Sequence, residues 1–315
     1  MKVFVTGAAG FIGSHLCERL AAQGAKVTGL DNFDPAYDPA VKWDNIAWLL
    51  KSGAFDLIEG DIRDEHAIAA ALAAGSFDVV IHLAARAGVR TSIADPLTCQ
   101  DVNIRGTAVL LDVSRRFDVP RFIFASSSSV YGNNEKVPFS ESDCVDHPIS
   151  PYAATKKAGE LICHTYHHLY GMHVTCLRFF TVYGPRQRPD LAIHKFARLI
   201  EDGRPIPVFG DGSMERDFTY IDDIIDGIMG AVARRGGYEI YNLGHSQPVR
   251  LDELVRRLEK ALGRKAVIER LPMQPGDVLR TYADIAKAER DLGFRPRTDL
   301  DAGLARFVEW LRRRR

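Results

Sequence analysis

A tyrosine and a lysine four residues apart are the side chains in this sequence best suited to proton transfer. Tyr152 and Lys156 follow Ser150 and Pro151, which are typical of a helix N-cap and first turn, so the pair is expected on one helix face. A free tyrosine has a pKa near ~10, so a tyrosine base needs a pKa lowered toward neutrality, which a buried ammonium together with the positive nicotinamide ring of an oxidised cofactor could provide. Such a pair also occurs by chance in many helices.

Four consecutive serines, Ser126 to Ser129, follow an apolar run at 121–125 that is typical of a buried strand. Serine runs are common in polar turns, because the hydroxyl bonds its own backbone. The run ends shortly before the helix of Tyr152, so the alternative is a row of hydroxyls that face a reacting group. The remaining motifs decide between these two interpretations.

A glycine-rich loop at the start of the chain indicates phosphate binding. Gly7, Gly10 and Gly13 lie between an apolar strand pattern and a helical pattern. Such glycines allow a tight turn, close approach to a pyrophosphate and close helix packing, and the helix N-terminus adds partial positive charge. Asp31 ends the next strand pattern, where a carboxylate bonds the adenosine ribose and repels a 2′-phosphate, so the pattern predicts NAD rather than NADP.

Further strand ends carry residues suited to the rest of the cofactor. Asp61 is expected to accept a hydrogen bond from the adenine amino group, with Ile62 against the ring; an ordinary helix cap is the less favoured alternative for Asp61, whereas core packing is an equal alternative for residues 83–85. Leu83, Ala84 and Ala85 would let the nicotinamide ribose lie against the backbone. The predicted cofactor-binding set is completed by Phe11, Ile12, Asn32, Asn103, Ser126, Tyr152 and Lys156.

The alternation of strand and helix patterns predicts an α/β fold. Parallel sheets covered by helices on both faces read as apolar strands separated by helical segments. We expect a doubly wound parallel-sheet Rossmann domain over residues 1–178, with some later segments returning to it, and a smaller mixed α/β C-terminal substrate lobe over 179–315. The predicted strands are 2–6, 26–30, 55–59, 77–83, 121–125 and 173–179.

Composition excludes several classes of partner. Lys plus Arg equals Asp plus Glu at 41 each, so no global field attracts nucleic acid or an anionic membrane. The five cysteines show neither C-x-x-C nor zinc spacing, which favours reduced thiols and predicts no metal site. With no signal peptide pattern and no run of ~20 apolar residues, the protein is expected to be cytoplasmic. The basic run 312–315 is expected to end a solvated helix.

Taken together, these motifs resemble the extended short-chain dehydrogenase/reductase superfamily, specifically its NAD-dependent nucleotide-sugar 4-epimerases. The resemblance covers nearly all of the chain and rests on the three glycines, "HLAA", "SSSSVYG", "SPYAATKKAGE", "LRFFTVYGP" and "ERDFTYIDDI". It implies that Ser127 assists Tyr152, and that Lys156 holds the nicotinamide ribose and tunes the tyrosine. It further implies that tightly bound NAD accepts and returns the C4 hydride, and that a homodimer forms through the helix bearing Tyr152.

The serine run bears on which reaction follows the 4-keto intermediate. Related sugar 4,6-dehydratases carry an Asp-Glu pair just before V-Y-G, and related glucuronate decarboxylases carry a Glu at the second of these positions. This chain has Ser128 and Ser129 there. Because hydroxyls are poor general acids for elimination or decarboxylation, simple epimerisation is the predicted outcome.

The substrate motifs look more like UDP-glucuronate 4-epimerases than UDP-galactose 4-epimerases, which typically have Asn at the position of Thr181 and lack "PRQRPD". A C5 carboxylate needs donors to replace its lost water. Arg90 and Arg186 have the alternative interpretation of surface charges. The candidate carboxylate donors are Ser127, Ser128, Ser129, Thr181, Arg90 and Arg188.

The nucleotide contacts come from the resemblance: Arg216 for the diphosphate, Val208 and Phe209 for the uracil, and Asp277 for a ribose. Gln274 departs from the galactose epimerases, which have Arg there. Two alternatives stay open, a UDP-glucose or UDP-N-acetylglucosamine 4-epimerase and a non-catalytic, NAD-sensing binding protein.

Overall fold

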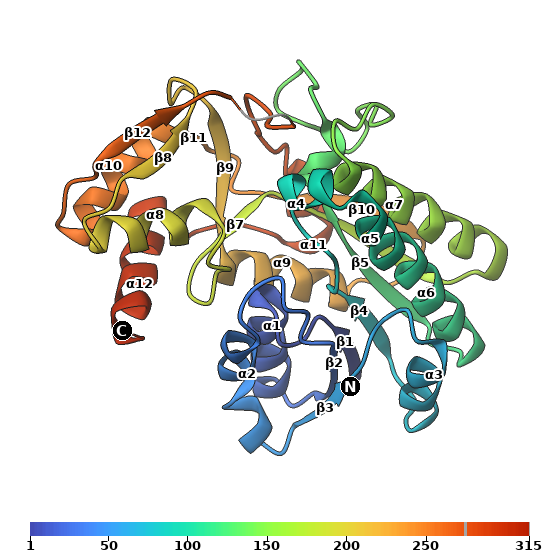
Figure 1. The fold of residues 1–315 in the computed structure, drawn as a ribbon. Helices are drawn as coiled ribbons and strands as arrows, with labels where there is room; N and C mark the ends of the chain where they lie inside the picture. The colour runs from blue at the N-terminus through green and yellow to red at the C-terminus, as the bar shows by residue number, and fades with distance from the viewer. Residues whose placement is uncertain (274–275, 315) are drawn as a thin grey trace.

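A seven-stranded parallel sheet forms the centre of the larger part of the molecule (Figure 1). The computed structural model describes residues 1–273 and 276–314. The strand order is β10-β6-β5-β4-β1-β2-β3, which reverses direction between β1 and β4 and thereby confirms the predicted doubly wound fold. The strands are β1 (Lys2–Thr6), β2 (Lys26–Asp31), β3 (Phe55–Glu59), β4 (Val79–His82), β5 (Arg121–Ser127), β6 (His173–Phe179) and β10 (Tyr238–Leu243).

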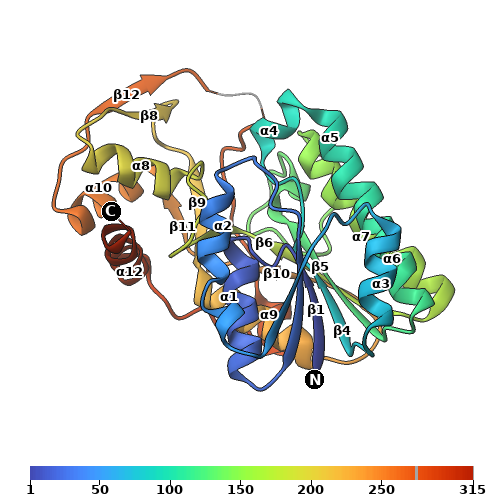
Figure 2. The same cartoon turned by 60° about the horizontal axis from the view of Figure 1, so that its bottom comes forward.

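Helices cover both faces of this sheet (Figure 2). Alternation along β1 explains the two layers, because Val3 and Val5 pack into one core and Phe4 into the other. One face carries α1 (Phe11–Ala22), α2 (Pro39–Ile46) and α9 (Ile221–Ala233), and the other carries α3 (Glu65–Ala73), α6 (Gly106–Arg116) and α7 (Pro151–Tyr170).

The later part of the chain builds a smaller region beside the sheet, at the left of Figure 1. Its three-stranded sheet has the order β11-β9-β7, and β12 pairs with β8. The chain then returns, because β10 joins the main sheet next to β6. The elements are β7 (Thr181–Tyr183), α8 (Ala192–Glu201), β8 (Ile206–Phe209), β9 (Glu215–Tyr220), β11 (Pro248–Arg250), α10 (Leu251–Leu262), β12 (Ile268–Leu271), α11 (Ala286–Leu292) and α12 (Leu300–Arg313).

Most of the short helical segments follow strands at the carboxyl edge of the main sheet, and one directly precedes β3 at the opposite edge. A π-helical turn at Asp101–Arg105 precedes α6, and such turns are frequent at functional sites. The short segments are η1 (Leu49–Lys51), α4 (Val89–Ala94), α5 (Pro96–Gln100), η2 (Asp101–Arg105) and η3 (Ser128–Tyr131).

Helix α7 has the ends that its sequence predicts. The Ser150 hydroxyl accepts a hydrogen bond from the amide of Ala153 at 3.1 Å, and Pro151 occupies the first turn. Gly171 ends the helix in the left-handed conformation, with φ 70°. These local signals confirm the predicted bounds of the helix that carries the tyrosine and the lysine.

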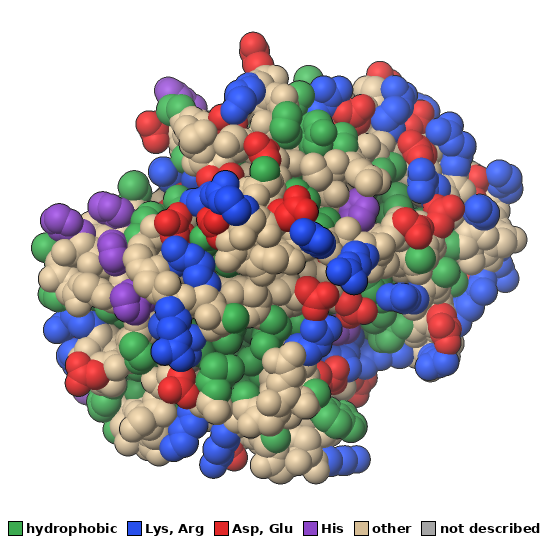
Figure 3. Space-filling view, turned by 180° about the vertical axis from the view of Figure 1, so that it is seen from behind, with side chains coloured by type: hydrophobic (Ala, Val, Ile, Leu, Met, Phe, Trp, Pro, Cys, Tyr) green, Lys and Arg blue, Asp and Glu red, His purple; other side chains and the backbone are tan. Residues whose placement is uncertain are grey.

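The surface carries both signs of charge without a dominant patch. Figure 3 shows basic and acidic side chains interspersed over the face seen from behind, as expected for a net formal charge of zero. Among the described residues, no helix combines the length and the apolar character that crossing a membrane requires.

The packing of α1 against β1 yields a stability prediction. A Cβ on Gly13 would lie against the carbonyl oxygen of Gly7, well inside van der Waals contact. We expect Gly13→Ala to lower the free energy of unfolding by about 1–3 kcal/mol or more, because the backbone must shift. Gly75→Ala is the control, since its Cβ would meet Phe77 at an ordinary 3.6 Å. Equal urea midpoints for the two variants would contradict the prediction.

Candidate active site

Tyr152, Lys156 and Ser127, the second serine of the run, lie close together where β5 ends. Lys156 is buried, and its Nζ donates to the carbonyl oxygen of Ala125 at 2.7 Å. The same Nζ lies 5.8 Å from the centre of the Tyr152 ring. The Ser127 hydroxyl is near enough to the phenol of Tyr152 to lower its pKa, and it donates a hydrogen bond to the Ser129 hydroxyl at 3.1 Å. The structure therefore brings together the three side chains predicted to be catalytic.

Burial sets the acidity of the tyrosine and the lysine in opposite senses. It raises the pKa of Tyr152, and the hydrogen bond of Ser127 and the charge of Arg188 only partly oppose this. Without the positive charge of a bound nicotinamide ring, desolvation of the phenolate outweighs these groups, and the predicted lowering of the tyrosine pKa stays a prediction for the NAD-bound enzyme. Burial lowers the pKa of Lys156 to about 8. The ammonium is thus poised to lose its proton just above neutral pH.

The glycine-rich loop forms a turn without side chains at the start of α1. Gly7 has a φ of 70°, and a Cβ there would lie 2.8 Å from the amide nitrogen of Ala84. Gly10 is the N-cap residue of α1. Residues 83–85 therefore lie beside this turn, as the shared cofactor role predicts. A bare backbone cradle at a helix N-terminus fits a pyrophosphate, so the residues present fit a dinucleotide.

Two predicted cofactor residues begin α1 directly after this cradle. The side chain of Phe11 is buried, and that of Ile12 packs against the same core. Leu83 likewise packs against this core from the loop after β4. The surface that these residues can present to a cofactor is therefore their backbone.

The carboxylate of Asp31 is buried and has a cationic partner. It accepts hydrogen bonds from the amides of Ala9 at 3.1 Å and Phe33 at 2.9 Å. The ammonium of Lys42, itself buried, lies 3.5 Å from the same carboxylate. Asp31 thus joins the glycine-rich loop to the segment after β2. The role of Lys42 was not predicted, because nothing in its local sequence marks it.

The carboxylate of Asp61 is already surrounded by donors. One oxygen accepts from the amide and Nε of Arg63, both at 2.9 Å, and the other accepts from Arg63 Nη2 at 2.8 Å and from Asn32 at 3.0 Å. The hydrogen bonds of Arg63 hold the pKa of Asp61 down at about 2. An adenine amino group would have to share these lone pairs, so the predicted contact stays a prediction.

Three further predicted contact residues have side chains that are buried in the protein. Ile62 is 4% exposed and packs against Gly106 in the core. Val208 is 3% exposed in another core. The hydroxyl of Ser126 donates to Glu160 at 2.6 Å. The predicted ligand contacts of these three residues stay predictions.

Asn103 organises the loop after β4. Its side-chain oxygen accepts from the amide of Arg86 at 2.7 Å, and its side-chain nitrogen donates to the Arg86 carbonyl at 3.1 Å. The same nitrogen donates to Thr155 on α7 at 3.0 Å. Asn103 therefore positions residues 83–88 against the catalytic helix. The π-helical turn that places it has no clear sequence signal.

Five of the predicted substrate residues line one open cavity of about 150 Å³. Ser128 and Ser129 belong to η3, Thr181 begins β7 and Arg216 lies on β9. Asp277 lies shortly before Arg280, which pairs with Glu215 at the start of β9. Their sequence positions span much of the chain. The cavity therefore collects hydroxyl groups and charges at the carboxyl edge of the sheet, where ligands of such folds bind.

The arginine of β9 has the surroundings of an anion ligand. Arg216 donates to the carbonyl oxygens of Glu215 at 2.9 Å and Leu279 at 3.5 Å. Within the described residues, no carboxylate forms an ion pair with it. Burial lowers its pKa, and the nearby carboxylate of Asp277 partly offsets this. A partly buried guanidinium that faces a cavity without an ion pair is suited to a diphosphate.

Arg90 lies with the predicted nucleotide residues. Its Nη2 donates to the carboxylate of Asp277 at 2.9 Å, and its guanidinium carbon lies 4.3 Å from the centre of the Phe209 ring. The sequence predicts Arg90 as a donor to the sugar carboxylate. The structure instead pairs it with the residues predicted for the ribose and the uracil. Gln274, the other residue in question here, lies outside the described residues.

Arg188 lies near the catalytic tyrosine. Its charge lowers the pKa of Tyr152, which opposes the dominant effect of burial. It makes a two-pronged ion pair with Asp190, at 3.0 and 2.6 Å, and donates to the Ala87 carbonyl at 3.2 Å. Arg188 is thus held by both the loop after β4 and its own segment. Asp190 as its partner was not predicted.

Arg186 secures this segment to the cofactor-binding helix. It has a φ of 65°, and its Nη2 donates to Glu18 of α1 at 2.7 Å. His15 of the same helix lies 3.0 Å from the carbonyl oxygen of Pro185. The alternative of a free surface charge at Arg186 is therefore wrong. Its role is to dock residues 184–190, and with them Arg188, on α1.

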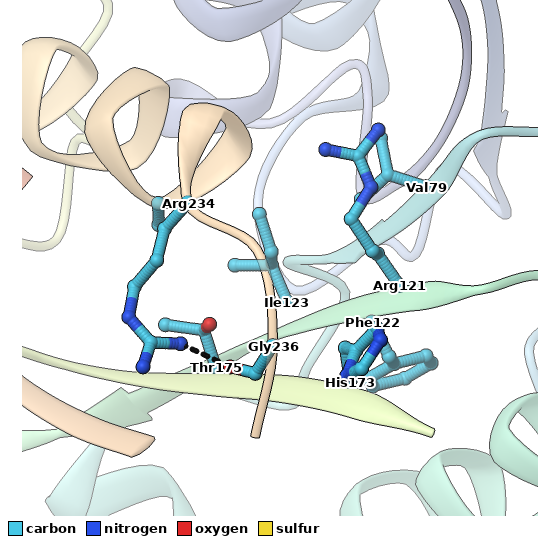
Figure 4. A pocket seen from close by; sticks show the side chains of 9 residues that line it. Val79, Arg121, Phe122, Ile123, His173, Thr175, Arg234 and Gly236 are labelled. Carbon is cyan, nitrogen blue, oxygen red and sulfur yellow. Dashed lines mark hydrogen bonds between the residues drawn. The ribbon is translucent and has the colours of Figure 1, made fainter. Parts of the chain in front are cut away.

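A second hollow lies at the opposite, amino-terminal edge of the main sheet (Figure 4). Arg121 and Arg234 line it, yet Arg121 donates to the carbonyls of Asp78 and Val232, and Arg234 donates to that of Gly236. These arginines therefore satisfy the ends of strands and helices. None of the predicted site residues lies in this hollow.

A doubly wound sheet with a glycine-rich turn and a Tyr-Lys-Ser site defines a dinucleotide-dependent enzyme class. The chain belongs to the NAD dependent epimerase/dehydratase family, whose model matches residues 3–244. It is 47% identical to UDP-glucuronate 4-epimerase 3 of Arabidopsis thaliana, over 98% of this chain and 76% of that protein.

Solved structures of related enzymes have the same fold along the whole chain. A UDP-glucuronic acid 4-epimerase from Bacillus cereus, in complex with UDP-glucuronic acid and NAD, is 39% identical, with a TM-score of 0.94 and full coverage of both chains. A UDP-glucose 4-epimerase from Thermotoga maritima, with UDP-glucose, is 32% identical, with a TM-score of 0.92 over 100% of this chain and 99% of that one.

The lowered pKa of Lys156 predicts how the reaction rate depends on pH. Lys156 is cationic below about pH 8 and neutral above it, and only the cation stabilises a phenolate at Tyr152. We expect kcat to fall as pH rises through about 8. In Lys156→Arg the guanidinium keeps its charge, so this alkaline decline should disappear although the rate is lower. The same decline in both proteins would contradict the assignment.

Proposed function

We propose that this protein is an NAD-dependent 4-epimerase that interconverts UDP-glucuronate and UDP-galacturonate through a transient 4-keto sugar. The observation that carries the proposal is the position of Arg188, whose charge acts on the phenol of Tyr152. We expect this cation to face the C5 substituent of a sugar whose 4-hydroxyl is bound at Tyr152. Hydroxyls of Ser128, Ser129 and Thr181 face the same cavity. Relatives at up to 47% identity support the substrate.

The protein's own groups have distinct tasks in this reaction. NAD, when bound, accepts the C4 hydride and later returns it to the opposite face. Tyr152 removes the proton of the 4-hydroxyl and returns it, and the Ser127 hydroxyl orients the phenol. The Lys156 ammonium, fixed on the Ala125 carbonyl, lowers the free energy of the phenolate. Ser128 and Ser129 cannot act as carboxylic acids, which disfavours elimination and decarboxylation.

The two parts of the chain divide the binding. Residues 1–178 hold the cofactor through Gly7, Gly10 and Asp31, with β10 completing their sheet. Residues 179–315 mainly bind the UDP-sugar. Arg216 binds the diphosphate, and Phe209, Asp277 and Arg90 enclose the nucleoside. The guanidinium of Arg90 stacks on the Phe209 ring and donates a hydrogen bond to the Asp277 carboxylate. The glycine cradle and the carboxylate of Asp31 favour NAD over NADP.

The alternatives fit the site less well. The substrates of a UDP-glucose or UDP-N-acetylglucosamine 4-epimerase carry a neutral hydroxymethyl group at C5. Such a group has no negative charge for Arg188 to bind. A non-catalytic NAD sensor has no use for a buried lysine that is held one helical turn from a tyrosine and a serine.

Direct assays decide among these substrates. The purified protein is incubated separately with UDP-glucuronate, UDP-glucose and UDP-N-acetylglucosamine, and products are followed by NMR. We expect turnover of UDP-glucuronate, and a loss of at least about 100-fold in Tyr152→Phe. Preferential turnover of a neutral sugar would refute the substrate assignment, and full activity of Tyr152→Phe would refute the mechanism.

Removing the Arg188 side chain tests the carboxylate contact. A charge-assisted hydrogen bond contributes about 1.5–3 kcal/mol, so Arg188→Ala should raise KM for UDP-glucuronate by roughly 10- to 100-fold. KM for UDP-glucose, if measurable, should change less. Arg198→Ala, which removes an exposed arginine of α8, is the matched control. Equal effects on both sugars would show that Arg188 only supports the fold.

We further propose a cytoplasmic homodimer. The five cysteines are free, which suits a reducing compartment. Leu97 of α5 is 75% exposed and Leu161 of α7 is 56% exposed, and these two helices are neighbours. A second copy would remove both from water.

Light scattering on the intact protein tests the dimer. We expect a mass of two chains, and a shift toward one chain in Leu161→Glu, because a buried carboxylate without a partner disfavours the interface. Trp48→Glu, at an equally exposed apolar residue far from α7, should leave the mass unchanged. A wild-type mass of one chain would refute the proposal.

A further inference from the structure

A buried polar network lies directly behind the catalytic tyrosine and lysine. Glu160 and Arg178 are both 1% exposed, and their side chains form two hydrogen bonds, from Nε to Oε1 and from Nη2 to Oε2, each at 2.8 Å. Ser126 donates to the same Glu160 oxygen at 2.6 Å. In the cross-strand register Ser126 lies opposite Arg178, so both residues are presented to α7 by neighbouring strands.

The network is aligned with the catalytic residues. Glu160 follows Lys156 by four residues and Tyr152 by eight, so all three share one face of α7. At the end of β5 three consecutive residues engage this face. Ala125 accepts from Lys156, Ser126 donates to Glu160, and Ser127 acts on the pKa of Tyr152. The ion pair thus fixes how far α7 can slide or rotate over β5.

The other end of the network reaches the substrate cavity. Arg178 Nη1 donates to the hydroxyl of Tyr131 at 2.9 Å, and that hydroxyl donates to Asn242 of β10 at 2.6 Å. Asn242 in turn donates to the Phe139 carbonyl at 2.8 Å. Tyr131 belongs to η3, the short helix that presents Ser128 and Ser129 to the cavity. Within the described residues, none of the network's buried side-chain polar atoms lacks a hydrogen-bond partner.

We propose that Glu160 and Arg178 are positioning residues, which hold the base on α7 and the carboxylate-binding hydroxyls on η3 in one fixed geometry. A buried ion pair contributes little net stability compared with apolar side chains of similar size, so stability alone does not account for it. Proton and hydride transfer need the reacting groups placed to within about 0.5 Å. This inference rests on the proposed epimerase function.

The test replaces both members of the ion pair at once. Glu160→Met with Arg178→Met leaves no buried charge unpaired, which single substitutions would do. We expect a folded, NAD-loaded protein whose kcat is lower by about tenfold or more. The acidic limb of its kcat profile should move to higher pH, because a displaced Lys156 stabilises the phenolate less. Loss of folding alone would not move this limb.

Two single variants complete the design. Tyr131→Phe keeps the ion pair but releases η3, so KM for UDP-glucuronate should rise several-fold while the pH profile stays unchanged. Asp223→Asn is the control, because this buried carboxylate of α9 caps only the amides of Arg297 and Thr298, both at 3.1 Å. It should lower thermal stability and leave kcat and KM unchanged.

The outcomes separate the two proposals. Wild-type protein without turnover of UDP-glucuronate would refute the proposed function and this inference with it. Normal wild-type turnover, combined with unchanged kcat, KM and pH profile in the folded variants, would refute the positioning role alone. If the double Met variant does not fold, unchanged kinetics of Tyr131→Phe suffice to overturn the inference.

Discussion

The hydrogen bond from Lys156 to the carbonyl of Ala125 is the constraint on which the site depends. It holds an ammonium in a buried place, where charge is costly, by means of a single backbone oxygen at 2.7 Å. The pairing of β5 with β4 ends at Phe124, whereas its pairing with β6 continues to Ser127, so Ala125 lies just beyond the end of β4. The same strand end brings Ser127 to Tyr152. Catalytic chemistry is therefore confined to the point where β5 and the start of α7 meet.

The charged side chains around this point differ in whether they form ion pairs. Those that organise the fold are fully paired, such as Asp31 with Lys42 and Glu160 with Arg178. Arg216, which faces the cavity, donates only to backbone oxygens and so keeps capacity for an anion. Arg216 thus differs from Arg90 and Arg188, whose guanidinium groups are paired with the carboxylates of Asp277 and Asp190.

Local sequence signals predicted the parts of this arrangement that depend on neighbours in the chain. Strands 55–59 and 173–179 and the ends of α7 have the predicted bounds, because alternation, capping and glycine act over a few residues. The same signals could not predict how deeply Ile62 is buried or how strongly burial raises the pKa of Tyr152. Whether a side chain at a strand end faces the ligand or the core, and how dry a phenol is, depends on elements packed from elsewhere.

The sequence by itself determined the doubly wound sheet, the glycine cradle and the Tyr-Lys pair, because each arises from patterns within one or two neighbouring elements. Only the tertiary structure decided which charges meet across the chain. It placed Arg90 on Phe209 and Asp277, docked Arg186 on Glu18, and linked Ser126 to Glu160. These contacts join residues as many as 187 positions apart, and burial rather than any local preference selects them.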